Sequence, residues 1–329
     1  MGNTRVTRLQ KSASVLAHVV MAMLLSGCSG PQSALDPAGL EAEHVAQLFW
    51  VMLIGAALVW AIVIGAAVFA GRFQNTPISE KAGLRIVLWA GAVFPTIVLA
   101  ALLIFGLRLL PVLRAPGADM TIEVSGEQFW WRVTYHPEGR PAVASANEIR
   151  LPVGASVEFV LTAPDVIHSF WIPSLGGKID MIPGRTNRLI LKPTKVGTYR
   201  GACAEFCGES HALMAFPIIV MQPAEFTAWL ERESADASSP VSPAAFLANG
   251  CGGCHTVKGT EANGVIGPDL THIASRQTIG AGILPNTPEH LGRFIAATET
   301  IKPGSRMPSF GMLPAQDAAS IVAYLGSLR

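Results

Sequence analysis

The sequence predicts a membrane-anchored chain of several domains, in which a two-helix transmembrane hairpin is followed by an all-β sandwich and then by a small all-α domain. Half of the 329 residues are hydrophobic and only 14% are charged, a balance typical of membrane proteins. Two stretches, 45–71 and 86–107, contain no charged residue, and the segments after them have the patterns of strands and then of helices. The net charge of +1 gives no reason to expect nucleic-acid binding.

The first 28 residues have the features of an export signal. Basic residues near the start precede an apolar run, 13–25, that is too short to span a bilayer. The final Leu-Ser-Gly-Cys resembles a bacterial lipobox, so we expect cleavage before Cys28 and lipidation of its thiol. A plain signal peptide with an incidental cysteine is the alternative. Residues 29–44 are small, polar and contain proline, and we expect them to form a tether.

The two uncharged stretches predict a transmembrane hairpin over 45–115, because each exceeds the ~20 residues that a helix needs to cross the hydrocarbon core. The connecting segment carries Arg72, Lys81 and Arg85 but only one acidic residue, Glu80, which places it in the cytoplasm. Both ends of the hairpin then face the outer side, in agreement with the export signal. Pro95, inside the second helix, predicts a kink.

Short β-rich runs separated by turn residues predict a small antiparallel sandwich over 116–233. The runs are 120–124, 129–135, 156–162, 188–192, 197–200 and 216–221. An amphipathic helix, 223–232, is expected to close this domain. Residues 234–242 are rich in Ala, Ser and Pro, and we expect them to form a linker to the helical domain.

The C-terminal domain, 243–329, contains a Cys-x-x-Cys-His motif formed by Cys251, Cys254 and His255. This motif is typical of c-type haem attachment, in which both thiols form thioether bonds and the histidine is an axial iron ligand. Met307, which stands before a proline, is the candidate for the second axial ligand. Its rivals are Met312, His272 and His290. A zinc-binding or redox-active Cys-x-x-Cys site is the alternative interpretation.

The densest set of metal-ligand residues lies in the segment 203–214, which we call the copper loop. It contains Cys203, Cys207, His211 and Met214. Thiolate, imidazole and thioether together favour copper over calcium, magnesium or manganese, and a zinc site would not normally recruit the methionine. Two thiolates that bridge two copper ions leave each metal in need of an imidazole, so a second histidine is expected. His168 is the best candidate, although taken alone it could be a structural histidine.

Residues 45–233 resemble subunit II of the haem-copper cytochrome c oxidases, which carries a binuclear copper centre known as CuA. The matching residues are 165–170, 173–176, 178, 180, 182–185 and 203–214. The resemblance implies a cupredoxin-like Greek-key fold, and it implies that the Glu205 backbone carbonyl is a copper ligand beside the side chains of His168, Cys203, Cys207, His211 and Met214. The Glu205 carboxylate would also reach a magnesium ion shared with subunit I. Because the C-terminal domain resembles a class I cytochrome c, the whole chain resembles the caa-type branch of the family.

The resemblance also implies a function. The chain would receive electrons for a respiratory terminal oxidase of the bacterial inner membrane, with its copper and haem domains on the periplasmic side. Electrons would pass from cytochrome c or haem c through CuA to haem a of subunit I, whose haem a3–CuB site reduces oxygen to water with proton translocation. Subunit III is the remaining implied partner. Two alternatives are a CuA-bearing subunit of a nitric oxide reductase and a copper-binding assembly protein.

One segment departs from the family pattern. Where many subunits II have Gln-Trp-Tyr-Trp, this chain has Gln128-Phe129-Trp130-Trp131, so a phenylalanine replaces the aromatic residue that usually receives electrons from soluble cytochrome c. We therefore expect electrons to arrive at the haem domain and to pass within the chain to copper. Phe129, Trp130 and Trp131 are the candidate electron-transfer residues. The alternative is that these aromatic residues mainly fill space beside the copper loop.

Overall fold

The computed structural model describes residues 29–73, 77–113 and 118–329, without the side chains of 109–113. The predicted export signal, 1–28, and its Cys28 therefore lie outside the described residues. The described chain divides into two compact units. One is formed by residues 43–118, and the other by the segments on either side of them.

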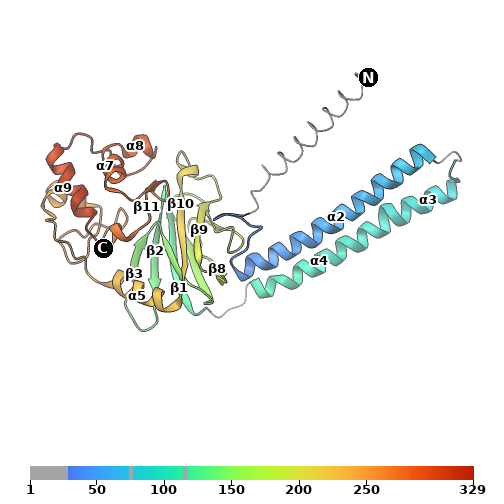
Figure 1. Ribbon diagram of the computed structural model, residues 1–329, viewed down its shortest axis with the longest axis horizontal. Coiled ribbons are helices and arrows are strands. Elements are labelled where there is room, and N and C mark those ends of the chain that lie inside the picture. The colour runs from blue at the N-terminus through green and yellow to red at the C-terminus, as the bar shows by residue number, and fades with distance from the viewer. Residues whose placement is uncertain (1–28, 74–76, 114–117) are drawn as a thin grey trace, which may run out of the picture. The chain divides into compact units, whose positions relative to one another are not determined.

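The unit 43–118 contains the predicted apolar hairpin (Figure 1). Helix α2 is Leu40–Phe73, and the return segment consists of helix α3, Glu80–Leu88, the π-helical turn η1, Trp89–Val93, and helix α4, Phe94–Leu113. By length and composition, both α2 and the return segment through Arg108 could cross a membrane. Pro95 is the second residue of α4, just beyond the π-helical turn, and its missing backbone donor disturbs the helical hydrogen-bond ladder there.

Two five-stranded sheets form the β-sandwich of the second unit (Figure 1). One sheet has the order β3-β2-β1-β5-β8 and the other β4-β10-β9-β6-β7. Most neighbouring strands are antiparallel, but β1 pairs with β5, and β10 with β4, in parallel. The strands are β1 Met120–Glu127, β2 Trp130–His136, β3 Val143–Ala146, β4 Ile149–Pro152, β5 Val157–Thr162, β6 His168–Trp171, β7 Ile179–Met181, β8 Asn187–Leu191, β9 Gly197–Cys203 and β10 Ala215–Met221.

The core of the sandwich is made by alternate residues of its strands, which point between the two sheets. In β5, for example, Phe159 is fully buried while its neighbours along the strand remain partly exposed. Three large aromatic side chains occupy the middle of the core: the ring centroids of Trp131 and Phe216 lie 4.9 Å apart, and those of Phe170 and Phe216 lie 5.0 Å apart. The burial pattern confirms the all-β domain that the sequence predicts.

Helix α5, Pro223–Ser234, closes the sandwich near the predicted position. The helix begins with a capping box, in which Gln222 and Glu225 satisfy each other's backbone N–H groups. Its apolar face places Phe226 and Trp229 against Tyr135 of β2, with the rings of Trp229 and Tyr135 5.1 Å apart.

The segment expected to be a tether packs along the sandwich as far as residue 42. The Ala38 N–H donates to the Ser174 carbonyl, and the Ala38 carbonyl accepts from the Thr194 N–H, at 2.7 Å each. The side chain of Ala38 is only 1% exposed. At Gly39 a Cβ atom would collide with the backbone of Leu175, so only glycine allows this close approach. The first residues of α2, 40–42, therefore belong to the same compact unit as the sandwich.

The C-terminal domain is mainly helical, as expected, and belongs to the same compact unit as the sandwich. Its elements are α6 Ala244–Ala248, η3 Cys251–Gly253, η4 Ile273–Ser275, the hairpin of β11 Thr278–Ile279 and β12 Leu284–Pro285, α7 Pro288–Ala296, α8 Thr298–Ile301 and α9 Ala315–Leu325. A separate apolar core holds these elements together, with Phe246 of α6 5.6 Å from Tyr324 of α9 between ring centroids.

Candidate copper and haem sites

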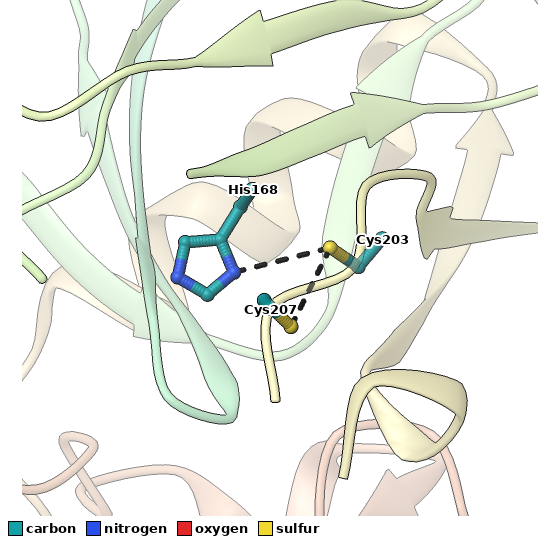
Figure 2. Close-up of side chains that lie close together, drawn as sticks. All are labelled: His168, Cys203 and Cys207. Atoms are coloured by element: carbon teal, nitrogen blue, oxygen red, sulfur yellow. Dashed lines mark hydrogen bonds between the residues drawn. The ribbon is translucent and has the colours of Figure 1, made fainter. Parts of the chain in front are cut away.

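The side chains predicted to bind copper lie together as a chain of close contacts. The Cys203 and Cys207 sulfurs are 3.9 Å apart, and Nδ1 of His168 is 3.9 Å from the Cys203 sulfur. Figure 2 shows the ring of His168 facing the Cys203 sulfur, with the Cys207 sulfur beside them, and the three ligand atoms all lie within 4.8 Å of one another. On the Cys207 side, Nδ1 of His211 lies 3.6 Å from the sulfur and the Met214 sulfur 3.9 Å from it. The structure therefore brings all five predicted side-chain ligands to one place.

The copper loop joins strand β9 to strand β10 and is closed by the backbone. Cys203 is the last residue of β9, and its N–H donates to the carbonyl of Met214 at 2.9 Å. A short 3₁₀ helix, η2, His211–Leu213, turns the chain back toward β10. The Glu205 carbonyl lies 3.2 Å from the Cys203 sulfur, while the Glu205 side chain is exposed. The carbonyl is thus available to the site and the carboxylate is available to a partner.

His168, the first residue of β6, is completely buried and held at both ring nitrogens. Nε2 lies 3.0 Å from Oδ1 of Asp165, and this contact leaves Nδ1 directed at Cys203. The other Asp165 oxygen accepts from the Gln128 N–H at 2.7 Å. Burial opposes protonation of His168, but the contacts with Cys203 and Asp165 outweigh it and raise the pKa of the imidazole. Such a carboxylate partner fixes the tautomer and orientation of a metal-binding histidine. The sequence interpretation gave Asp165 no such role, although it lies in the matching segment.

The two thiols of the copper loop influence each other's ionisation. The contact with Cys207 is the largest influence on Cys203 and, against the effect of burial, lowers the pKa of the Cys203 thiol. The same contact, followed by burial, raises the pKa of the Cys207 thiol. A thiolate is the ligand form of cysteine, so metal binding would release the protons that these thiols hold.

This set of donors fits a pair of copper ions and fits zinc less well. Two sulfurs stand between two imidazoles, and a thioether and a backbone carbonyl complete the group, which is a soft set with more donors than one tetrahedral zinc would use. His168, Cys203, Cys207 and Met214 are all at most 7% exposed, so water has little access. Among the described residues this is the one His, Cys and carboxylate cluster with metal-binding geometry, through His168, Cys203 and Cys207.

The haem motif lines a cavity in the C-terminal domain. Cys251, Cys254 and His255 are on its wall, and so is Met307, which is distant in the sequence. The two thiols form no disulfide. The cavity is walled mainly by apolar side chains of the C-terminal domain, with Gln128, Phe129, Trp130 and Asn147 of the sandwich completing it. A large apolar cavity with two free thiols, an imidazole and a thioether fits a covalently attached haem.

The backbone orients the imidazole of His255. Nδ1 lies 2.8 Å from the Pro268 carbonyl, so it carries the proton, and Nε2 is left free. Burial lowers the pKa of His255, which keeps the ring neutral as an iron ligand requires. Gly267, just before Pro268, allows this contact, because a Cβ atom there would lie 2.5 Å from Cε1 of the ring. The Gly-Pro segment thus supports the histidine.

Two polar side chains on the cavity wall have buried atoms without a hydrogen-bond partner. They are Nε of Arg276 and Oγ1 of Thr278. A buried donor without a partner is costly, so each atom indicates a polar group that the cavity would receive. The carboxylates of haem propionates are of the right chemistry. No sequence pattern marks these two residues, since an Arg and a Thr two positions apart are common in any loop.

The structure distinguishes Met307 from its rivals by position. Met312 is 78% exposed and is not on the cavity wall. Nε2 of His272 contacts the Ala235 carbonyl, and Nδ1 of His290 contacts the Thr287 hydroxyl. Neither histidine lines the cavity.

The three aromatic candidates for electron transfer occupy different surroundings. Trp131 is fully buried beside Phe216, so it fills space in the sandwich core, which is the alternative role given above. Trp130 and Phe129 line the haem cavity. Phe129 also packs on the copper loop, because a Cβ atom at Gly208 would lie 3.0 Å from its ring. Phe129 therefore contacts both sites.

Comparisons with known proteins agree with both domains. Residues 120–222 match the family model described as cytochrome c oxidase subunit II, periplasmic domain, and residues 243–329 match the model for cytochrome c. Cytochrome c oxidase subunit 2 of Alkalihalophilus pseudofirmus is 35% identical, over 98% of this chain and 99% of its own length. The protein of the same name from Bacillus sp. strain PS3 is 30% identical, over 94% of this chain and 95% of its own length.

Among solved structures, the periplasmic domain of subunit II of cytochrome oxidase from Bradyrhizobium japonicum is 35% identical. It covers 36% of this chain and 99% of its own length, with a TM-score of 0.34. The relatives that match from end to end extend the likeness beyond this one domain to the apolar hairpin and the C-terminal domain. The chain therefore belongs to the cytochrome c oxidase subunit 2 family of haem-copper oxidases, in the form that carries its own cytochrome c domain.

Proposed function

We propose that this chain receives electrons at its cytochrome c domain and passes them through its copper site to haem a of subunit I, where oxygen is reduced to water with proton translocation. The observation that carries the proposal is the contact between the two sites: Phe129 lines the haem cavity and packs against Gly208 of the copper loop. When bound, the haem and the copper pair each supply a one-electron carrier. A single chain would thus hold both carriers in one compact unit.

The copper side chains act as a rigid and closed set of donors. His168, Cys203, Cys207, His211 and Met214, with the Glu205 carbonyl, would hold the metal pair and leave no open position for a substrate. Asp165 and the backbone contact between Cys203 and Met214 hold the donors in place before metal arrives. A preorganised set needs little rearrangement when the charge of the metal changes, which suits electron transfer. The exposed Glu205 carboxylate would reach a magnesium ion shared with subunit I.

The haem side chains form a second closed set. Cys251, Cys254, His255 and Met307 would hold the haem, and Arg276 and Thr278 would bind its carboxylates. A methionine ligand raises the reduction potential relative to histidine alone, which suits a carrier that accepts electrons from a donor cytochrome c. Since Trp130 and Phe129 cover the cavity from the sandwich side, an external donor would approach the haem domain elsewhere.

The membrane arrangement follows from the hairpin. Helix α2 and the return segment would both span the bacterial inner membrane, with the connection between them in the cytoplasm and the copper and haem domains on the periplasmic side. Cys28 would become the lipidated N-terminus. The chain would assemble with subunits I and III and take electrons from a cytochrome c.

The test of this function is stopped-flow reduction of the native oxidase by reduced soluble cytochrome c. Replacing both haem thiols, Cys251→Ala with Cys254→Ala, prevents haem attachment without touching the copper loop. We expect reduction of the copper site to slow by at least about tenfold in this variant, because the route through the haem domain is gone. Deletion of 243–329 should have the same effect. A copper reduction rate equal to that of the wild type in both variants would contradict the proposal.

A further inference from the structure

The haem domain is fixed to the sandwich through the turn of its small hairpin. Ala281, between β11 and β12, is completely buried within the core cluster of the sandwich. Its carbonyl accepts from the N–H of Ala215, the first residue of β10, at 3.0 Å. At the neighbouring Gly282, a Cβ atom would lie 3.1 Å from the Ala215 backbone. This turn therefore packs into the sandwich at Ala215, the residue that follows Met214.

A second contact at the same place involves a buried lysine. Lys302, after helix α8, is 3% exposed, and its ammonium donates to the Leu213 carbonyl at 2.9 Å and to the Gly280 carbonyl. One acceptor belongs to the copper loop and the other to the haem domain. None of the salt bridges among the described residues includes Lys302. The Lys302 side chain therefore bonds to two backbone carbonyls, one on each side of the boundary.

Pro303, the residue after Lys302, makes a further contact with the copper loop. The hydroxyl of Ser210, which is fully buried in the copper loop, donates to the Pro303 carbonyl at 2.6 Å. Ser210 and Leu213 stand on either side of the ligand His211. The chain then runs from Pro303 to Met307 on the haem cavity wall. A short segment thus joins the surroundings of a copper ligand to the candidate iron ligand.

Burial of this lysine needs an explanation other than stability. An ammonium loses favourable hydration when it is buried, and replacement of a buried ionic group by a well-packed apolar residue is often neutral or stabilising. An apolar side chain donates no hydrogen bonds, so it cannot hold two particular carbonyls from two domains at a fixed separation. The contacts of Lys302 and Ser210 therefore set the position of one site relative to the other.

We propose that Lys302 and Ser210 form a latch that positions the Met307 segment of the haem domain on the copper loop, and so fixes the separation across which electrons pass. The latch rests on the proposed electron route. Other contacts lie farther along the boundary: Arg150 donates to the Ser275 carbonyl, and the Gln277 N–H donates to the Glu148 carboxylate. They join the two domains but do not fix the position of the Met307 segment.

Two measurements on the full chain in the native oxidase test the latch. The variants are Lys302→Met, Ser210→Ala and the double substitution. The Ala215 amide donates across the boundary, so its hydrogen exchange should become about tenfold faster or more in the double variant. Exchange at the Gln277 amide, farther along the boundary, should stay unchanged. The first-order rate of electron transfer from haem c to copper, followed after flash reduction of the haem, should fall on the order of tenfold, with both optical spectra and both midpoint potentials unchanged.

Matched substitutions away from the boundary are the controls. Lys195→Met removes an exposed lysine paired with Asp36, and Ser320→Ala removes an exposed hydroxyl within helix α9. Both should leave exchange at Ala215 and the electron-transfer rate as in the wild type. Wild-type exchange at Ala215 in the double variant would overturn the latch. So would a shifted haem potential at an unchanged transfer rate, because Lys302 would then serve the haem itself. Absence of haem-to-copper transfer in the wild type would instead refute the proposed function, and the exchange result would still decide whether the latch exists.

Discussion

Gly267→Ala should displace the axial histidine of the haem site. A Cβ atom at position 267 would lie 2.5 Å from Cε1, 2.8 Å from Nδ1 and 3.1 Å from Nε2 of His255. Ordinary carbon contacts are about 3.5–4.0 Å, so the ring would have to move by about 1 Å. That movement breaks the hydrogen bond of 2.8 Å between Nδ1 and the Pro268 carbonyl. Overpacking costs about 1–3 kcal/mol and the lost hydrogen bond about 1 kcal/mol, so we expect a loss of about 2–4 kcal/mol.

The assay combines the yield of covalently attached haem, its absorption spectrum and the thermal unfolding of the haem domain followed by haem absorbance. Gly253→Ala is the matched control, because Gly253 lies in the motif that contains His255 and a Cβ atom there would meet nothing within 4 Å. Neither glycine has a positive φ, so the comparison tests space alone. If Gly267→Ala kept the haem yield, spectrum and unfolding midpoint of the control, the contact between Gly267 and His255 would not govern the site.

Three further outcomes follow from the structure. Trp131→Ala should destabilise the sandwich by about 3–5 kcal/mol in denaturant unfolding, because it removes the centre of the aromatic core, whereas Trp130→Ala, at a partly exposed position, should cost clearly less. Cys207→Ser should abolish the near-infrared copper band and lower the copper content, with the circular dichroism of the sandwich unchanged. Burial lowers the pKa of Lys302 from 10.5 to about 7, so between these pH values the unfolded chain binds the extra proton and the free energy of unfolding should rise with pH. In Lys302→Met that rise should be flatter, and an identical pH dependence would show that the lysine is not buried in solution.

The sequence predicts the copper and haem motifs well because their chemistry is local. Four ligands of the copper loop stand within twelve residues, and the haem motif within five, so spacing alone carries the information. His168 required a second argument, the need for another imidazole. The sequence does not predict the role of Asp165. That role depends on strand β6, which places Nε2 of His168 beside the Asp165 carboxylate, and only the fold shows this contact.

Sequence patterns do not predict the boundary between the sandwich and the haem domain, for a physical reason. The acceptors of Lys302 and Ser210 are the backbone carbonyls of Leu213, Gly280 and Pro303, and every residue has a carbonyl. The expected tether illustrates the same limit. Its small and polar composition predicts a tether, but a composition does not show that Gly39 lies against the backbone of Leu175.

The central claim is that one chain carries electrons from its haem to its copper site. It is tested most directly by flash reduction of haem c in the purified native oxidase, with the haem band and the near-infrared copper band followed together in the absence of oxygen. The account predicts that the haem is reoxidised as the copper is reduced, with one first-order rate that does not depend on protein concentration. A haem that stays reduced, or a rate that rises in proportion to protein concentration, would contradict it.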